Sequence, residues 1–330
     1  MNKVIKSVVL LIVIFSMISI VGCSQSDNEK SDTDTNYIEE EYNLETSAGT
    51  IFGTLMMPED LESSTVAVII AGSGPTDRDG NNPTISGKND SLKMIAEALA
   101  NEGISSVRYD KRGIGESAAL VEKEEDLIFE DYINDVVDWV DRLKEDTRFD
   151  KVVIIGHSEG ALIGATAAYS SDVDGFVSIA GMGYSAYDTL ARQLKEQSEE
   201  VYQISEPIIE ELKQGNLVDD VPEGLHSLFR PSVQPYMISW FKYNPVEEIS
   251  KIEKPILIIQ GDNDIQITIE DAELLNQGNP DAELVILRGM NHILKDAPED
   301  REENLATYSD PELPLNQQLI EELTTFINEL

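Results

Sequence analysis

Cysteine, histidine and basic residues are all scarce in this sequence. Its 330 residues include one cysteine, Cys23, and three histidines. A single cysteine excludes a disulfide within one chain, and no paired Cys/His pattern of a metal site is present. Only 24 Lys and Arg residues balance 63 Asp and Glu residues, so the formal net charge is −39. Because phosphate backbones are bound by clusters of Lys and Arg, this balance argues against a nucleic-acid partner.

The N-terminus has the features of an export signal. Lys3 and Lys6 precede an apolar stretch at 8–21, which is too short for a comfortable membrane span and has the size of a signal-peptide core. The stretch ends in Ile-Val-Gly-Cys at 20–23, which resembles the lipobox of bacterial lipoproteins. An ordinary secretory signal with an incidental cysteine is the alternative.

The lipobox resemblance implies a set of expectations about location. Residues 1–22 would be a lipoprotein signal peptide, and Cys23 would carry the lipid. The mature protein would be anchored on the outer, extracytoplasmic face of the bacterial cytoplasmic membrane and would contact the membrane only through this lipid. Residues 24–41 are polar and acidic, so they cannot bury enough surface to fold. We therefore predict a disordered tether at 23–41 and a folded domain at 42–330.

Strand and helix patterns alternate through the folded domain. Apolar strand patterns occur at 42–47, 50–57, 65–72, 104–110, 151–155, 175–181, 255–261 and 282–289, and helical patterns at 91–103, 127–145 and 316–330. The first two strands flank Ala48-Gly49 as in a hairpin. The alternation and the near-continuous apolar strands predict an α/β fold with a mostly parallel central sheet flanked by helices.

One long segment interrupts this alternation. Residues 182–250 show helical patterns at 186–203, 206–215 and 235–242 but no convincing strand. We interpret the segment as a helical cap over the mouth of the sheet. A peripheral helical subdomain without substrate contact is the alternative.

A serine lies at a predicted strand-to-helix corner. Gly156-His157-Ser158-Glu159-Gly160 follows the strand at 151–155 and precedes a helix-compatible run. A tight corner of this kind exposes the serine Oγ near a helix N-terminus, where backbone N–H groups favour negative charge. Glycines on both sides would avoid side-chain clashes at the corner. A purely structural turn is the alternative for this motif taken alone.

A nucleophilic serine requires a general base, and histidine is the usual one at neutral pH. His157 adjoins the serine, so its side chain is expected to point away and to pack or hydrogen-bond. His226 lies in the predicted cap. His292 follows the last predicted strand, in a loop with Gly289 and Asn291, and elimination therefore favours it as the base. Asp262 and Asp264 both follow the strand at 255–261, and spacing alone does not decide which of them would orient the imidazole.

Together these motifs resemble the α/β-hydrolase superfamily over about residues 42–330. The resemblance implies the α/β-hydrolase fold, and it selects Asp264 as the acid beside Ser158 and His292. It also implies that the backbone N–H groups of Ser73, in Ala-Gly-Ser-Gly at 71–74, and of Glu159 form an oxyanion hole. The segment 108–117 resembles the loop that shapes the mouth of the site in this family. Asp77, Arg78 and Asp79 are expected to brace the neighbouring loop through ion pairs.

The predicted function is a serine hydrolase, a carboxylesterase acting on small esters with short to medium acyl groups. No cofactor or metal is implied, because the sequence has neither a phosphate-binding lysine loop nor a dinucleotide fingerprint. An aminopeptidase-type serine peptidase, with acidic residues such as Glu199, Glu200, Glu210 or Glu211 binding a free amine, and an acyltransferase are alternatives on the same fold. A non-catalytic ligand-binding surface lipoprotein is the alternative from another class. The sequence does not indicate an oligomeric state.

Overall fold

The computed structural model describes residues 37–60 and 64–330. The predicted signal peptide, Cys23 and most of the predicted tether therefore lie outside the described residues.

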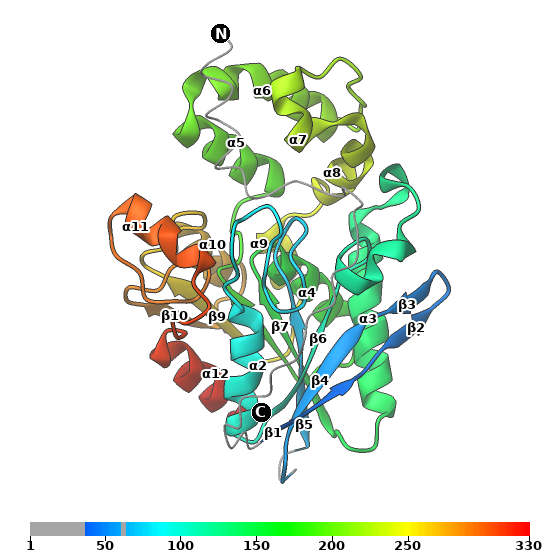
Figure 1. Ribbon diagram of the computed structural model, residues 1–330, viewed down its shortest axis with the longest axis vertical. Coiled ribbons are helices and arrows are strands. Elements are labelled where there is room, and N and C mark those ends of the chain that lie inside the picture. The colour runs from blue at the N-terminus through cyan, green and yellow to red at the C-terminus, as the bar shows by residue number, and fades with distance from the viewer. Residues whose placement is uncertain (1–36, 61–63) are drawn as a thin grey trace.

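An eight-stranded sheet forms the centre of the protein (Figure 1) in the order β1-β4-β6-β5-β7-β8-β9-β10. Its strands are β1 (Tyr37–Glu41), β4 (Gly53–Pro58), β5 (Thr65–Ile70), β6 (Ser105–Tyr109), β7 (Lys151–His157), β8 (Gly175–Ile179), β9 (Ile256–Gly261) and β10 (Glu283–Leu287). β4 pairs antiparallel with β1 and β6, and every pair from β6 to β10 is parallel. The predicted mostly parallel sheet is confirmed.

Helices cover both faces of this sheet. They are α2 (Ser91–Asn101), α3 (Phe129–Glu145), α4 (Glu159–Ser170), α10 (Ile269–Gly278) and α12 (Gln317–Glu329), whereas the short α11 (Arg301–Ala306) belongs to the segment between β10 and α12. Alternate residues of β5 point to opposite faces: Val66 and Val68 pack with α3 and α4, whereas Ala67 and Ile69 pack with α2 and α12. Because both faces are buried, the strand is a continuous apolar run rather than an alternating one.

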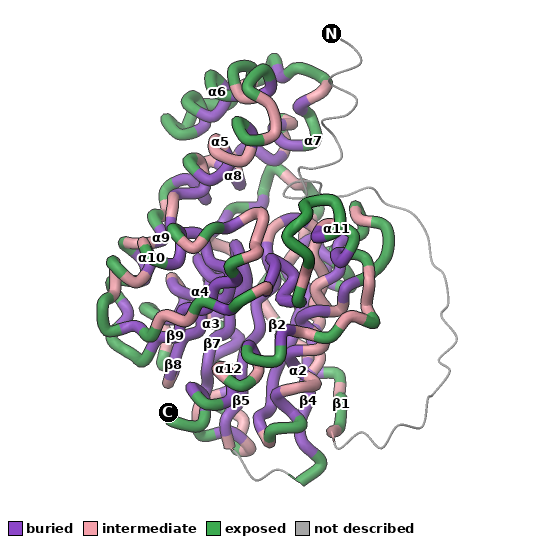
Figure 2. Tube along the Cα trace, turned by 90° about the vertical axis from the view of Figure 1, so that its left-hand side faces the viewer, coloured by how far each residue is buried: buried purple, intermediate pink, exposed green. Residues whose placement is uncertain are grey.

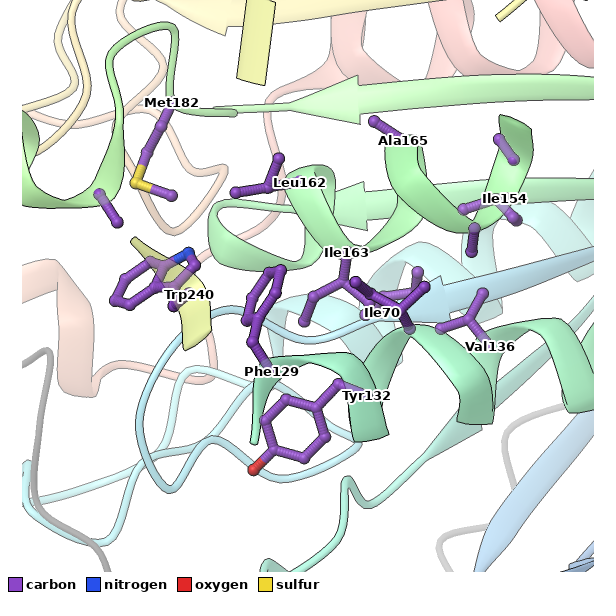
Figure 3. Packing of buried hydrophobic residues seen from close by; sticks show 14 of the residues in the cluster. Ile70, Phe129, Tyr132, Val136, Ile154, Leu162, Ile163, Ala165, Met182 and Trp240 are labelled. Atoms are coloured by element: carbon purple, nitrogen blue, oxygen red, sulfur yellow. The ribbon is translucent and has the colours of Figure 1, made fainter. Parts of the chain in front are cut away.

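The segment between β8 and β9 is helical and stands beyond one end of the sheet (Figure 1). We call residues 182–250 the insertion; it contains α5 (Ala186–Gln197), α6 (Glu199–Lys213), α7 (His226–Phe229), α8 (Gln234–Trp240) and α9 (Pro245–Ile249). Its outer surface is largely exposed, and buried residues line its inner side (Figure 2). Trp240 and Met182 of the insertion belong to the same apolar core as Phe129 and Leu162 (Figure 3), so the insertion is packed onto the sheet domain.

The break between the first two helices of the insertion was predicted wrongly. The sequence suggested helices at about 186–203 and 206–215. In the structure the break lies at Ser198, whose side chain caps α6 by accepting the N–H of Val201, and Pro207 lies inside α6. Val201, Ile208 and Ile209 form one buried stripe along α6. Packing of this stripe therefore outweighs the lost proline hydrogen bond.

The start of the folded domain was also predicted too late. Tyr37–Glu41, assigned to the tether, forms the edge strand β1 and pairs with β4. Glu39 forms an ion pair with Arg108 at 2.6 Å, and Glu40 forms one with Arg148 at 2.8 Å. Composition alone cannot reveal these partners, because they come from distant parts of the chain. The predicted hairpin at Ala48-Gly49 exists as β2 (Leu44–Thr46) and β3 (Gly49–Ile51), although the predicted strand 50–57 is divided between β3 and β4.

Candidate active site

Ser158 occupies a strained corner between β7 and α4. Its backbone has φ 57° and ψ −119°, a region that non-glycine residues rarely adopt and that costs about 1–3 kcal/mol. The flanking glycines permit the corner because backbone approaches there closely. A Cβ on Gly156 would lie 2.6 Å from the Cα of Ala161, and one on Gly160 would lie 2.8 Å from the carbonyl oxygen of Ala71. Larger residues at either position would therefore push α4 away from β5 and β7.

Two loops at the carboxyl end of the sheet bring an acid and an imidazole to this serine. His292, in the loop after β10, has its Nε2 3.2 Å from the Oγ of Ser158. The Nδ1 of the same ring lies 2.7 Å from Oδ2 of Asp264, in the loop after β9. The three side chains that the sequence analysis selected therefore form one hydrogen-bonded series.

The environment of Asp264 keeps its carboxylate ionised. Burial alone would raise its pKa, but His292 and the N–H groups of Ile267 and Gln266 outweigh this and hold the pKa of Asp264 below its usual value. An ionised carboxylate only accepts, so Nδ1 of His292 must donate, and Nε2 is left to accept the Ser158 hydroxyl proton. Asp262 instead accepts the N–H of Gly289 at 2.6 Å and is exposed, so it braces the turn.

The other two histidines have structural contacts. Nε2 of His157 lies 2.8 Å from the carbonyl oxygen of His292. Burial, together with the nearby His292 ring, lowers the pKa of His157 to about 3, so the ring is neutral and its Nε2 donates to that carbonyl. His157 therefore ties the loop of His292 to the serine corner, as its predicted hydrogen-bonding role suggests. His226 contacts the carbonyl oxygen of Val221 at 2.9 Å within the insertion.

Ser73 and Glu159 both lie beside Ser158. Glu159 is the first residue of α4, and an N–H in the first turn of a helix has no acceptor within the helix. Ser73 follows the end of β5 and shares the lining of two pockets with Ser158. The preceding residue, Gly72, passes so near that an added Cβ would be 3.2 Å from the Cβ of Ser158. Both residues are therefore placed where their N–H groups can face a substrate oxygen at Ser158.

The loop after Ser73 is braced by ion pairs, with partners in the segment 108–117 and in β6. Arg78 pairs with Asp110 at 2.7 Å and also contacts Glu116, and Asp79 pairs with Arg108 at 2.6 Å. Asp77 makes no such pair among these contacts; its carboxylate accepts the N–H groups of Asp79 and Asn81. Arg78 and Asp79 therefore brace the loop through ion pairs, as expected. Asp77 braces it through hydrogen bonds to the backbone of a turn instead.

Two pockets meet at Ser158. The insertion pocket lies between the serine and the insertion, and its lining is mainly apolar. Its apolar lining residues are Met182, Ala186, Leu190, Trp240 and Ile267. The second pocket lies on the side of His292, and we call it the polar pocket because it has more polar side chains than the insertion pocket, although most of its lining surface is apolar. Its polar lining includes Thr76, Asn82, Asn89, Ser91, His292 and Tyr308.

The four acidic residues considered as an amine site lie elsewhere. Glu199, Glu200, Glu210 and Glu211 are exposed on α6, outside the lining of both pockets. They form a solvated helix face.

A buried charge cluster next to the serine was missed by the sequence analysis. Lys111 is 1% exposed and lies 3.0 Å from the carboxylate of Glu159, which also accepts the hydroxyl of Tyr236 at 2.7 Å. In the sequence the only indication of this cluster is that Lys111 directly follows an apolar strand. A lysine at such a position is usually solvated, so it does not point to a buried cluster.

Residues 37–60 and 64–330 contain neither a side-chain cluster suited to a metal ion nor a helix suited to span a membrane. No group of three or more His, Cys, Asp or Glu side chains is arranged to hold a metal ion. No helix there has both the length and the apolarity to cross a membrane.

The chain is similar in sequence to known hydrolases. A family model described as "Serine aminopeptidase, S33" matches residues 87–220. Esterase EstD of Thermotoga maritima is 28% identical over 259 residues, which are 73% of this chain but only 57% of the esterase. The chain thus spans little more than half the length of this relative.

Solved structures share the architecture at low sequence identity. Est1E from Butyrivibrio proteoclasticus with bound ferulic acid has a TM-score of 0.58 and 17% identity, covering 88% of this chain and 100% of that one. The Pyrococcus furiosus esterase Pf2001 has a TM-score of 0.59 and 17% identity, covering 96% and 98%. The chain therefore has the α/β-hydrolase fold, with a mostly parallel eight-stranded sheet flanked by helices, and its sequence is similar to that of a known esterase.

Proposed function

We propose that this protein is a carboxylesterase with Ser158 as nucleophile, His292 as general base and Asp264 as the residue that orients the imidazole. The observation that carries the proposal is the continuous series from Asp264 through His292 to the Oγ of Ser158, at a strained corner that lines both pockets. The similarity to Esterase EstD supports ester hydrolysis as the reaction.

The proposed reaction proceeds in two halves. The Ser158 oxygen attacks the ester carbonyl while His292 takes the hydroxyl proton, and the ionised Asp264 stabilises the resulting imidazolium. The carbonyl oxygen becomes negatively charged and is bound by the N–H groups of Ser73 and Glu159, each worth about 3 kcal/mol. His292 then returns the proton to the departing alkoxide. A water molecule, activated by the same imidazole, releases the acid from the acyl-enzyme.

The two pockets suggest how the ester is oriented. The departing alcohol must receive a proton from His292, and His292 lines the polar pocket. We therefore assign the alcohol to the polar pocket and the acyl group to the insertion pocket, whose apolar lining suits a short to medium chain. The ferulic acid bound in the Butyrivibrio structure also favours a small ester substrate.

An aminopeptidase-type peptidase is the second candidate, favoured by the description of the matched family. A substrate with a free amine needs a carboxylate at the end of its pocket. The acidic residues of α6 that might bind the amine are exposed and lie outside both pockets. The ester is therefore the preferred substrate. An acyltransferase would use the same residues with an alcohol in place of water.

The first prediction concerns the acyl group. Nitrophenyl esters of increasing chain length should be hydrolysed, and aminoacyl nitroanilides should not. In Ala186→Phe the new ring would fill the insertion pocket. The kcat/KM for nitrophenyl octanoate should therefore fall at least about tenfold, whereas kcat/KM for nitrophenyl acetate should change little. Ala191→Phe, on the same helix but outside the pocket lining, is the matched control. Faster cleavage of nitroanilides than of every ester would favour the peptidase instead.

The second prediction separates the two aspartates. Asparagine at position 264 keeps the shape but presents an amide to Nδ1 of His292, which favours the wrong tautomer and costs about 10⁴ in turnover in the protease template. We expect kcat of Asp264→Asn to fall by at least about a hundredfold on that basis. Asp262→Asn keeps an oxygen acceptor for the Gly289 N–H, so the kcat of this variant should fall by less than about tenfold. The opposite ranking in steady-state kinetics would transfer the acid role to Asp262.

We also propose that the protein is a lipoprotein anchored outside the cytoplasmic membrane through Cys23, with the domain held off by the segment that follows it. The proposal rests on the sequence features at 3–23. Two acyl chains give stable anchoring where one does not. Cys23→Ala should therefore move an active enzyme from the membrane fraction to the soluble fraction on cell fractionation. A variant that stays in the membrane pellet after a salt wash would place the anchor elsewhere.

A further inference from the structure

Lys111 is a buried cation that contacts the backbone at the serine corner. It follows β6, and its Nζ donates to the carbonyl oxygen of Gly72 at 2.6 Å and to Oε2 of Glu159 at 3.0 Å. The side chains of Lys111 and Glu159 are 1% and 2% exposed. A charge buried to this degree is costly unless its partners are well placed, so the contacts of Lys111 call for an explanation.

The contact with Gly72 fixes the direction of the next N–H. The carbonyl of Gly72 and the N–H of Ser73 belong to one peptide plane, and in a trans peptide they point in opposite directions. Because the ammonium holds the carbonyl on the buried side, the Ser73 N–H is turned away from Lys111. Ser73 lines both pockets beside Ser158, so this orientation directs its N–H towards the reaction centre.

The contact with Glu159 involves the other proposed oxyanion donor. The N–H of Glu159, in the first turn of α4, has no acceptor within the helix. Its carboxylate is held by Lys111 on one oxygen and by the Tyr236 hydroxyl on the other. Burial raises the pKa of Tyr236 well above 10, so its hydroxyl remains a donor. Both oxyanion residues are therefore attached to the same ammonium, one through its side chain and one through the preceding carbonyl.

We propose that Lys111 is a positioning residue of the oxyanion hole, which aims the N–H groups of Ser73 and Glu159 and polarises the Gly72–Ser73 peptide. The inference rests on the proposed hydrolase function and concerns the same site. Lys111 does not touch the substrate. Its charge draws electron density towards the Gly72 oxygen and so makes the Ser73 N–H a stronger donor as negative charge develops on the substrate.

The competing explanation is a buried ion pair that only stabilises the fold. Lys111→Met alone does not discriminate, because it leaves the buried Glu159 carboxylate without a cation and so destabilises the protein. The double variant Lys111→Met/Glu159→Gln removes both charges while keeping the side chains of similar size. Such neutral replacements of buried pairs are often tolerated. Arg112 and Asp135, another ion pair of low exposure that begins at the next residue, provide the matched control Arg112→Met/Asp135→Asn.

The test compares these proteins in ester hydrolysis and in inhibition by a trifluoromethyl ketone, whose serine adduct carries an oxyanion. Removing one oxyanion donor costs about 10²–10³ in kcat. We expect kcat of Lys111→Met/Glu159→Gln to fall by about a hundredfold and ketone affinity to fall in parallel, with KM within about threefold. Thermal unfolding should show both double variants folded. Glu159→Gln alone keeps the Lys111–Gly72 contact, so its kcat and its ketone affinity should fall less than those of the double variant.

Each outcome decides the proposal. It is overturned if the Lys111/Glu159 variant loses no more kcat and ketone affinity than the Arg112/Asp135 control, or if Glu159→Gln alone accounts for the whole loss. It is also overturned if KM rises while kcat is unchanged. Failure of the wild-type protein to hydrolyse any ester or to bind the ketone would instead contradict the hydrolase function itself.

Discussion

The close approach of backbone at the β7–α4 corner is the constraint on which the site depends. Gly156 and Gly160 let α4 begin directly against β5 and β7, and the resulting turn leaves Ser158 at a positive φ. The parallel sheet then determines where everything else meets. Loops that follow parallel strands emerge at the same edge, so Asp264 after β9 and His292 after β10 reach the serine without any long excursion of the chain.

Scarce basic residues hold the loops at this edge in an otherwise acidic protein. Arg78 joins the loop after β5 to Asp110, and Arg112 joins the segment after β6 to Asp135 of α3. Lys111 lies between them and joins both loops to the first residue of α4. With 63 acidic residues available, a cation is seldom without a partner. What these three cations share is that each pairs with a buried or nearly buried carboxylate.

The elements of the sheet domain could be predicted from the sequence because they obey local rules. Buried parallel strands such as β5 and β9 are short apolar runs, and the Gly-x-Ser-x-Gly turn has a steric cause that sequence alone reveals. His292 followed from elimination among three histidines. The choice of Asp264 over Asp262 needed a family resemblance, because residues two apart would share a direction if the loop were extended, and the sequence does not show that a turn separates them.

The features that were missed depend on distant partners. β1 was assigned to a tether because the cations that pair with Glu39 and Glu40 lie far along the chain, at Arg108 and Arg148. The helix break at Ser198 depends on packing inside the insertion rather than on Pro207. The position of Lys111 after an apolar strand was a weak signal, because a lysine is ordinarily exposed, and only the folded protein shows the Glu159 carboxylate and the Gly72 carbonyl around it.

Covalent capture of the nucleophile tests the central claim most directly. The protein would be treated with a fluorophosphonate, and the modified residue located by mass spectrometry of its peptides. The structure predicts one adduct, on Ser158, whose formation is lost in Ser158→Ala and becomes at least about a hundredfold slower in His292→Ala because the base is absent. No adduct, an adduct on another serine, or labelling of Ser158 at an unchanged rate in His292→Ala would contradict the account.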